Sequence, residues 1–84
     1  MGEVAISLKV TPQGPEIDLD DIEEKIRDEF PVEDSSKEEI GFGLTALKIL
    51  VVRDEEEGGT DDIENYISDI EGVTSVEVEG VSLV

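Results

Sequence analysis

The chain has 84 residues, of which 24 are acidic and 6 are basic, so its formal net charge is −18. That length suits one small domain, which we expect to span residues 1–84. Direct binding to nucleic acid or to an anionic membrane is not expected, since both need cationic side chains. Cysteine and histidine are absent, so we expect no disulfide, no thiolate chemistry and no metal site.

The acidity has two explanations. In a halophilic host, concentrated salt screens the carboxylates, which form a solvated surface without individual roles. Alternatively, the carboxylates match a basic partner surface. The acids spread from Glu3 to Glu79 instead of clustering, which favours the halophilic explanation. No apolar run reaches the roughly 20 residues of a membrane span, and the start Met1-Gly2-Glu3 does not resemble a signal peptide, so we expect a cytoplasmic protein.

The first expected elements are a strand and a helix. Apolar and polar residues alternate over Glu3–Val10, which predicts a half-buried strand. A helix then begins near Asp18, a favourable N-cap residue, and ends before Pro31. Its apolar stripe, at spacings of three and four, consists of Leu19, Ile22, Ile26 and Phe30.

Two strands follow, joined by the turn Gly41-Phe42-Gly43. The first, Ser35–Phe42, has an acidic start and a weak pattern. The second, Leu44–Arg53, belongs to the most apolar stretch of the chain and is apolar on both faces. A strand with two apolar faces is usually central in its sheet.

The rest of the chain repeats the pattern. After the acidic loop Asp54–Gly59, Thr60 caps a second helix, and Gly72 suits its C′ position. The stripe of this helix consists of Ile63, Tyr66, Ile67 and Ile70. The last strand, Val73–Val84, changes its alternation phase across Gly80, which predicts a β-bulge there.

The order of these elements is β-α-β-β-α-β. This order predicts an α+β, ferredoxin-like fold, in which a four-stranded antiparallel sheet carries both helices on one face. The other face is then bare unless a partner covers it.

Neither acidic run points to a cation site. Asp18-Leu19-Asp20-Asp21 lacks the ligand spacing and the glycine of an EF-hand loop, and helix capping explains it. The run Asp54-Glu55-Glu56-Glu57 is typical of a solvated loop. No nucleophile–base pair can be assembled without histidine or cysteine, and Gly58-Gly59 is too short for a phosphate loop. We therefore expect a protein that is not an enzyme and needs no cofactor.

The turn Gly41-Phe42-Gly43 has two interpretations. Phe42 either fills the core of the hairpin or serves as an interface anchor. The two glycines leave the backbone beside the ring thinly covered, which suits an anchor.

The run Ile40–Val52, followed by an acidic loop, resembles translation elongation factor 1-beta, most of all the archaeal form that consists of the exchange domain alone. The similarity covers the whole chain. It includes Met1-Gly2-Glu3-Val4, Lys9-Val10-Thr11-Pro12, Asp18-Leu19-Asp20, Glu71-Gly72-Val73 and Val76-Glu77-Val78.

The resemblance implies a function. Members of this family are ferredoxin-like guanine-nucleotide exchange domains that release GDP from elongation factor 1-alpha, so that GTP can bind during translation elongation. By its match to the family's aromatic motif, the segment Gly41, Phe42, Gly43 and Leu44 is the expected partner-binding site. In eukaryotic members a C-terminal lysine reaches the magnesium region of the partner. Gly80-Val81-Ser82-Leu83-Val84 contains no lysine, so other residues must replace it.

Two other classes of function stay open. Ferredoxin-like domains also serve as regulatory modules that bind small ligands between paired copies. An acidic structural subunit of a larger assembly would have the same composition.

Overall fold

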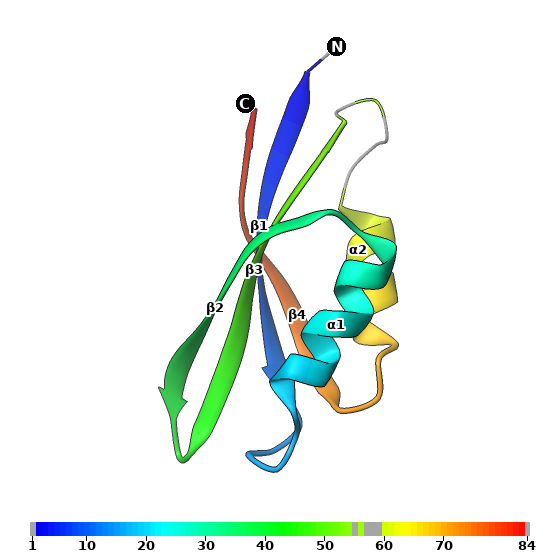
Figure 1. Ribbon diagram of the computed structural model, residues 1–84. Helices are drawn as coiled ribbons and strands as arrows, with labels where there is room; N and C mark the ends of the chain where they lie inside the picture. The colour runs from blue at the N-terminus through cyan, green and yellow to red at the C-terminus, as the bar shows by residue number, and fades with distance from the viewer. Residues whose placement is uncertain (1, 55, 57–59, 84) are drawn as a thin grey trace.

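The computed structural model describes residues 2–54, 56 and 60–83. Its elements, in chain order, are β1 (Glu3–Pro12), α1 (Leu19–Glu29), β2 (Val32–Gly41), β3 (Leu44–Asp54), α2 (Asp61–Ser68) and β4 (Val73–Leu83). The strands form one antiparallel sheet in the order β2-β3-β1-β4, and both helices lie on one face of it (Figure 1). The predicted ferredoxin-like fold is confirmed, and so is the central place of β3.

The core lies between the helices and the sheet and is almost entirely aliphatic. Alternate residues of β1 and β3 point toward the helices, whose apolar stripes face the sheet. The buried side chains include Val4, Ile6, Leu8, Val10, Leu47, Ile49, Val51, Leu19, Ile22, Ile26, Ile63, Ile67 and Ile70. At its edge, Phe30 and Tyr66 pack edge to face, with ring centroids 5.6 Å apart. The second face of the sheet carries no helix (Figure 1).

The helix starts agree with the sequence only in part. Asp18 caps α1 as predicted, because its carboxylate accepts a hydrogen bond from Asp20 N at 3.0 Å. Thr60 occupies the N-cap position of α2, but its side chain does not cap the helix. Its backbone is helical, with φ −102° and ψ −6°, and its hydroxyl donates to Glu64 Oε1 at 2.7 Å instead.

The prediction for Gly72 was wrong. Helix α2 ends at Ser68 with Asp69 as its C-cap, so Gly72 lies in the following turn. Its φ of +101° suits glycine, and its carbonyl accepts a hydrogen bond from Gln13 N at 2.7 Å. A Cβ at this position would lie 3.1 Å from Ile17 Cγ2. Glycine is required here by the turn and by its close approach to Ile17.

Strand β2 differs from the predicted strand Ser35–Phe42 at both ends. It begins three residues earlier, at Val32, and the register shift opposite β3 passes over Glu33. The first residues gave no strand signal, because β2 is an edge strand whose side chains are mostly exposed. It ends at Gly41, since the φ of +56° at Phe42 is incompatible with a strand.

A bulge interrupts β4 as predicted, but it lies one residue before the predicted position, Gly80. Ser7 pairs with Gly80 and Leu8 pairs with Val78, so Glu79 is the extra residue. Beyond the bulge, Val81 and Leu83 pair with core-facing residues of β1 and therefore turn toward the helix-bearing face. Val84 lies outside the described residues.

Candidate partner-binding site

The hairpin between β2 and β3 closes in a two-residue turn. Gly41 and Leu44 form the last pair of the ladder, so Phe42 and Gly43 are the loop. Their φ angles are +56° and +76°, and two successive positive φ values are typical of a type I′ turn, which matches the twist of a hairpin. Glycine adopts such angles freely, whereas the Cβ of phenylalanine crowds its own backbone there. Among the described residues, Phe42 is the one non-glycine residue with a positive φ.

The ring of Phe42 makes no use of the core. Its side chain is 100% exposed, which rules out the interpretation that it fills the hairpin interior. A fully exposed phenylalanine gains nothing from burial in the free protein. Both the backbone conformation of Phe42 and the exposure of its ring to water are thus energetically unfavourable in the free protein.

The four residues predicted as the site do lie together. Gly41 and Gly43 are exposed beside Phe42, and a Cβ at either position would meet nothing within 4 Å. The two glycines are therefore needed for their positive φ angles and not for close packing. Leu44 is half-buried at the base of the turn. The tip thus presents one aromatic ring on a bare backbone.

A second exposed apolar site lies at the opposite end of the molecule. Val81 and Leu83 are 56% and 76% exposed, and with Phe42 they are the large exposed hydrophobic residues of the described chain. The hairpin is at one end of the sheet, and the C-terminal end of β4 is at the other (Figure 1). The molecule is 42 Å long, so the two sites are well separated.

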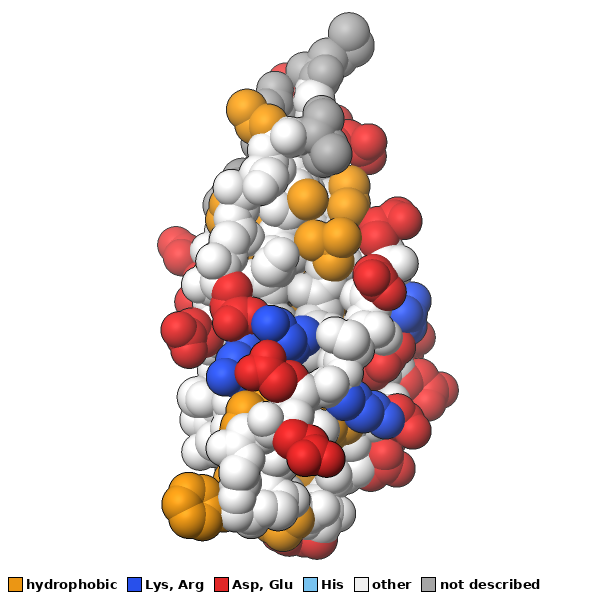
Figure 2. Space-filling model, turned by 90° about the vertical axis from the view of Figure 1, so that its left-hand side faces the viewer, with side chains coloured by type: hydrophobic (Ala, Val, Ile, Leu, Met, Phe, Trp, Pro, Cys, Tyr) orange, Lys and Arg blue, Asp and Glu red, His pale blue; other side chains and the backbone are white. Residues whose placement is uncertain are grey.

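The sheet face that carries no helix is called the open face below. Charged side chains lie across its middle, between these two ends. Lys48 Nζ on β3 lies 3.2 Å from Glu79 Oε1 on β4 and 3.3 Å from Glu38 Oε2 on β2. Lys9 Nζ on β1 lies 4.0 Å from Glu38 Oε1. Hydrogen bonding to Glu79, and then to Glu38, raises the pKa of Lys48 above its ordinary value. Figure 2 shows these opposite charges gathered on that face, where they partly offset the acidity of the chain.

Comparison with known proteins identifies the family. A model of the EF-1 guanine nucleotide exchange domain matches residues 5–84. The chain belongs to this family. Elongation factor 1-beta of Methanoculleus marisnigri is 43% identical over 84 residues, which cover 100% of both chains. The protein of that name from Natronomonas pharaonis is 40% identical over 85 residues, covering 96% of this chain and 97% of its own. That of Staphylothermus marinus is 43% identical over 86 residues, covering 96% of each.

Membership of the EF-1 guanine nucleotide exchange domain family confirms the function expected from the sequence. The chain is a guanine-nucleotide exchange factor of translation elongation. The family match begins at Ala5 in β1 and runs through β4, so it includes the hairpin, the open face and the exposed end.

The acidic runs contribute no observed site. Of the loop Asp54–Gly59, only Asp54 and Glu56 are described. Within residues 2–54, 56 and 60–83, no group of three acidic side chains could hold a metal ion. No described helix is long and apolar enough to span a bilayer.

Sequence reasoning missed two features of the surface. The first is the exposure of Val81 and Leu83, which their strand-like alternation concealed. The second is the ion pair between Lys48 and Glu79, which lie 31 residues apart and meet only across β1. A lysine on the solvent-facing side of an otherwise apolar central strand was the one available signal.

Proposed function

We propose that this chain accelerates GDP release from elongation factor 1-alpha and that Phe42 anchors it on that GTPase. The observation that carries the proposal is a positive φ at a fully exposed aromatic residue. Such a residue lowers the stability of the free protein. Residues held in sparsely populated conformations cluster at functional sites, where binding or catalysis offsets the free energy that the conformation costs.

Binding of Phe42 to the GTPase offsets this free-energy cost. Placing a phenylalanine ring in an apolar pocket is worth about 1.5–3 kcal/mol. The tight hairpin holds the ring in place before binding, which lowers the entropy lost on association. Gly41 and Gly43 allow a partner surface to approach the backbone on both sides of the ring. Leu44 extends the apolar contact toward the sheet.

Exchange by this route is a coupling between two binding sites on the GTPase. The chain must bind the nucleotide-free form more tightly than the GDP-bound form, and GDP then weakens its binding by the same factor. Contact near the magnesium ion or the phosphate-binding loop of the GTPase provides such coupling, because both hold the β-phosphate of GDP. This mechanism requires a rigid surface and neither a nucleophile nor a base.

Val81 and Leu83 supply the second contact in this proposal. They stand at the end of the molecule opposite Phe42 and expose aliphatic side chains without a lysine. Two contacts on one rigid sheet allow the chain to hold two parts of the GTPase in an arrangement that disfavours GDP. The C-terminal end of β4 then acts as a steric wedge.

The remaining assignments follow from this role. Residues 1–84 form one exchange domain that works in the cytoplasm without a cofactor or a metal ion of its own. Nucleic acid and membrane are not partners, since the charge of −18 opposes both.

The test is nucleotide release from purified elongation factor 1-alpha of the same organism. The GTPase is loaded with a fluorescent GDP analogue in concentrated potassium chloride, and the protein is added. We expect faster release, with the acceleration reduced at least about tenfold by Phe42→Ala. Exposed Thr74→Ala on β4 is a matched control and should leave the rate unchanged. Absence of acceleration by the unmodified protein would overturn the proposal.

A binding experiment separates this role from that of a structural subunit. The chain is immobilised and captures nucleotide-free GTPase, and GDP is then added. An exchange factor should release the GTPase, because its binding is coupled to that of the nucleotide. Capture that GDP and GTP do not affect would indicate a structural subunit instead.

A further inference from the structure

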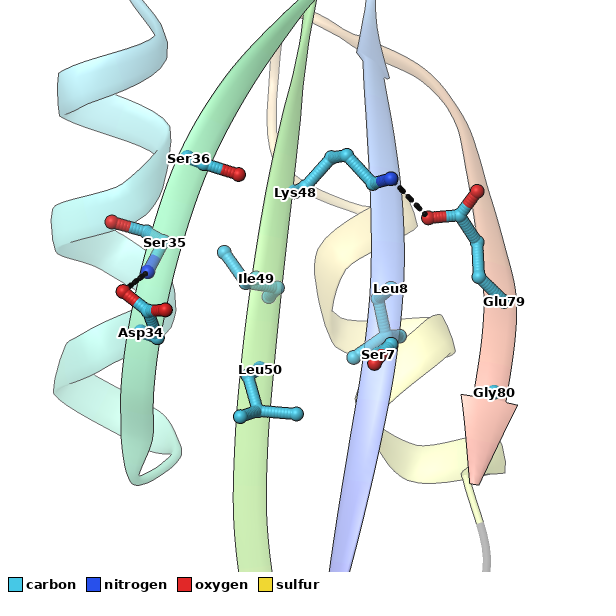
Figure 3. Close-up of a pocket in the computed structure, with 10 residues that line it drawn as sticks. All are labelled: Ser7, Leu8, Asp34, Ser35, Ser36, Lys48, Ile49, Leu50, Glu79 and Gly80. Carbon is cyan, nitrogen blue, oxygen red and sulfur yellow. Dashed lines mark hydrogen bonds and ion pairs between the residues drawn. The ribbon is translucent and has the colours of Figure 1, made fainter. Parts of the chain in front are cut away.

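The open face of the sheet contains a groove that the proposed contacts do not use. Its volume is about 460 Å³, and it is lined by Ser7, Leu8, Asp34, Ser35, Ser36, Lys48, Ile49, Leu50, Glu79 and Gly80. Figure 3 shows the groove with β2 along one side, β4 along the other, and β3 and β1 between them. It is open to solvent and faces away from both helices.

The groove arises from one row of residues that crosses all four strands. Asp34 on β2 pairs with Leu50 on β3, which pairs with Ser7 on β1, which pairs with Gly80 on β4. Leu50 projects from this row, while Ser7 and Gly80 carry almost no side chain. A hollow is therefore left on the β1 and β4 side of Leu50. The bulge at Glu79 places a carboxylate beside this hollow.

The charge of the groove favours a cation. Asp34 and Glu79 line it from opposite edge strands, and Lys48 is the one basic residue in its lining. The ammonium group of Lys48 is already shared between Glu79 and Glu38. The negative charge of the lining is therefore in excess, and the net charge of −18 repels anionic ligands.

We propose that this groove receives an extended segment of the partner GTPase that carries a lysine or an arginine. The aliphatic stem of such a side chain packs along Leu50, while its charged head reaches Asp34 or Glu79. Ser7 and Gly80 leave room for the segment's backbone. This inference rests on the proposed function, because it assigns a second surface to the same partner.

The position of the groove supports the same partner. Its β2 side and part of its floor belong to the two strands that end in the Phe42 turn. A partner held at Phe42 thus lies at the end of the same sheet that carries the groove (Figure 1). Contact along the sheet extends from the hairpin to the groove without crossing a helix.

Filling the groove tests the steric part. A Cβ at Gly80 meets nothing within 4 Å and its φ is not positive, so Gly80→Val fits the fold. Ser75→Val adds a comparable bulk to the same strand outside the groove lining and is the matched control. We expect Gly80→Val to weaken binding to nucleotide-free elongation factor 1-alpha about tenfold. Ser75→Val should leave the affinity unchanged.

Removing one charge tests the electrostatic part. Asp34→Asn retains an oxygen that can accept the hydrogen bond from Ser35 N, now 2.9 Å from Asp34 Oδ1. Glu33→Gln makes the same charge change on the neighbouring exposed residue outside the groove lining. We expect Asp34→Asn to weaken binding about two- to fivefold and to reduce its salt dependence. Glu33→Gln should change neither.

The outcomes separate this inference from the proposed function. Normal affinity in both Gly80→Val and Asp34→Asn, together with normal exchange by the unmodified protein, would overturn the groove alone. Equal losses in the groove variants and their controls would also overturn it, because the effect would not depend on the groove. If the unmodified protein fails to accelerate release, the proposed function and the inference both fail. Urea denaturation of each variant establishes that it is folded; if Gly80→Val does not fold, Ser7→Val fills the hollow from β1.

Discussion

Arg53 Nη1 lies 3.0 Å from both carboxylate oxygens of Asp62, which joins the end of β3 to the first turn of α2. Arg53 is the one charged side chain that the described part of the chain buries. Its guanidinium also lies 5.7 Å from the centre of the Phe30 ring, at the end of α1. One buried cation thus connects the sheet with both helices.

We predict that Asp62→Asn lowers the free energy of unfolding by about 1 kcal/mol, because it replaces a charge-assisted hydrogen bond with a neutral one. Asp61→Asn is the control, since Asp61 also lies in the first turn of α2 and loses the same favourable interaction with the helix dipole. Urea denaturation in concentrated salt measures both. Equal losses for the two variants would show that the dipole, and not Arg53, explains the effect.

Two exposed glycines should respond to alanine with opposite signs. Neither Gly43 nor Gly80 would place a Cβ within 4 Å of other atoms, but Gly43 has a φ of +76°. Gly43→Ala should cost about 1 kcal/mol, because alanine disfavours that φ. Gly80→Ala should stabilise by about 0.4–1 kcal/mol, since it restricts the unfolded chain. Thermal denaturation of the pair checks this, and a loss of stability in both would contradict it.

Phe42 should lower the free energy of unfolding of the free protein and at the same time support its exchange activity. Asparagine tolerates a positive φ better than phenylalanine does, so Phe42→Asn should raise the free energy of unfolding by about 0.5–1 kcal/mol. The same variant should lose most of its exchange activity, because it removes the ring. Both quantities are measured on one preparation. A variant that is destabilised would show that the ring contributes to folding after all.

The raised pKa of Lys48 predicts a loss of stability at high pH. A lysine whose pKa is higher in the folded state stabilises the fold fully below its unfolded pKa, near 10.5, and loses that contribution as the pH rises through the folded value. Stability should therefore fall above about pH 10. This decline should be smaller in Lys48→Met than in the unmodified protein. Urea midpoints of the two proteins, compared between about pH 9 and about pH 12, measure the difference. An identical decline in both proteins would assign it to other groups.

Salt should stabilise this protein if its acidity is a halophilic adaptation. Self-repulsion among the carboxylates weakens as the Debye length falls from about 10 Å in 0.1 M salt to about 3 Å in 1 M salt. We therefore expect the thermal midpoint to rise steeply over that range of potassium chloride. A neutral osmolyte at matched osmolarity is the control. A midpoint that salt does not change would favour the alternative, that the carboxylates match a basic partner.

Local sequence signals located most of the fold. The alternation of Val4, Ile6 and Leu8 predicted the buried face of β1, and Asp18 with Pro31 predicted the limits of α1. The change of phase at Gly80 predicted the bulge within one residue. Each of these signals lies within a few neighbouring residues, where backbone geometry and side-chain periodicity act directly.

Other features depended on contacts between distant parts of the chain. Pairing with β3 decided that β2 begins at Val32, although its acidic residues carry no strand pattern. The motif around Phe42 led to the proposed site, but the exposure of the ring and its positive φ became visible only in the folded hairpin.

The order of the elements, the aliphatic core and the family could all be read from the sequence alone, and so could the segment that we propose as the partner-binding site. The groove exists only in the folded protein, because Ser7 and Gly80 stand side by side only after β1 and β4 pair. The contact of Lys48 with Glu79 across β1 likewise forms only on folding. A hydrophobic period is a local property of the chain, whereas a surface is assembled from residues that only folding brings together.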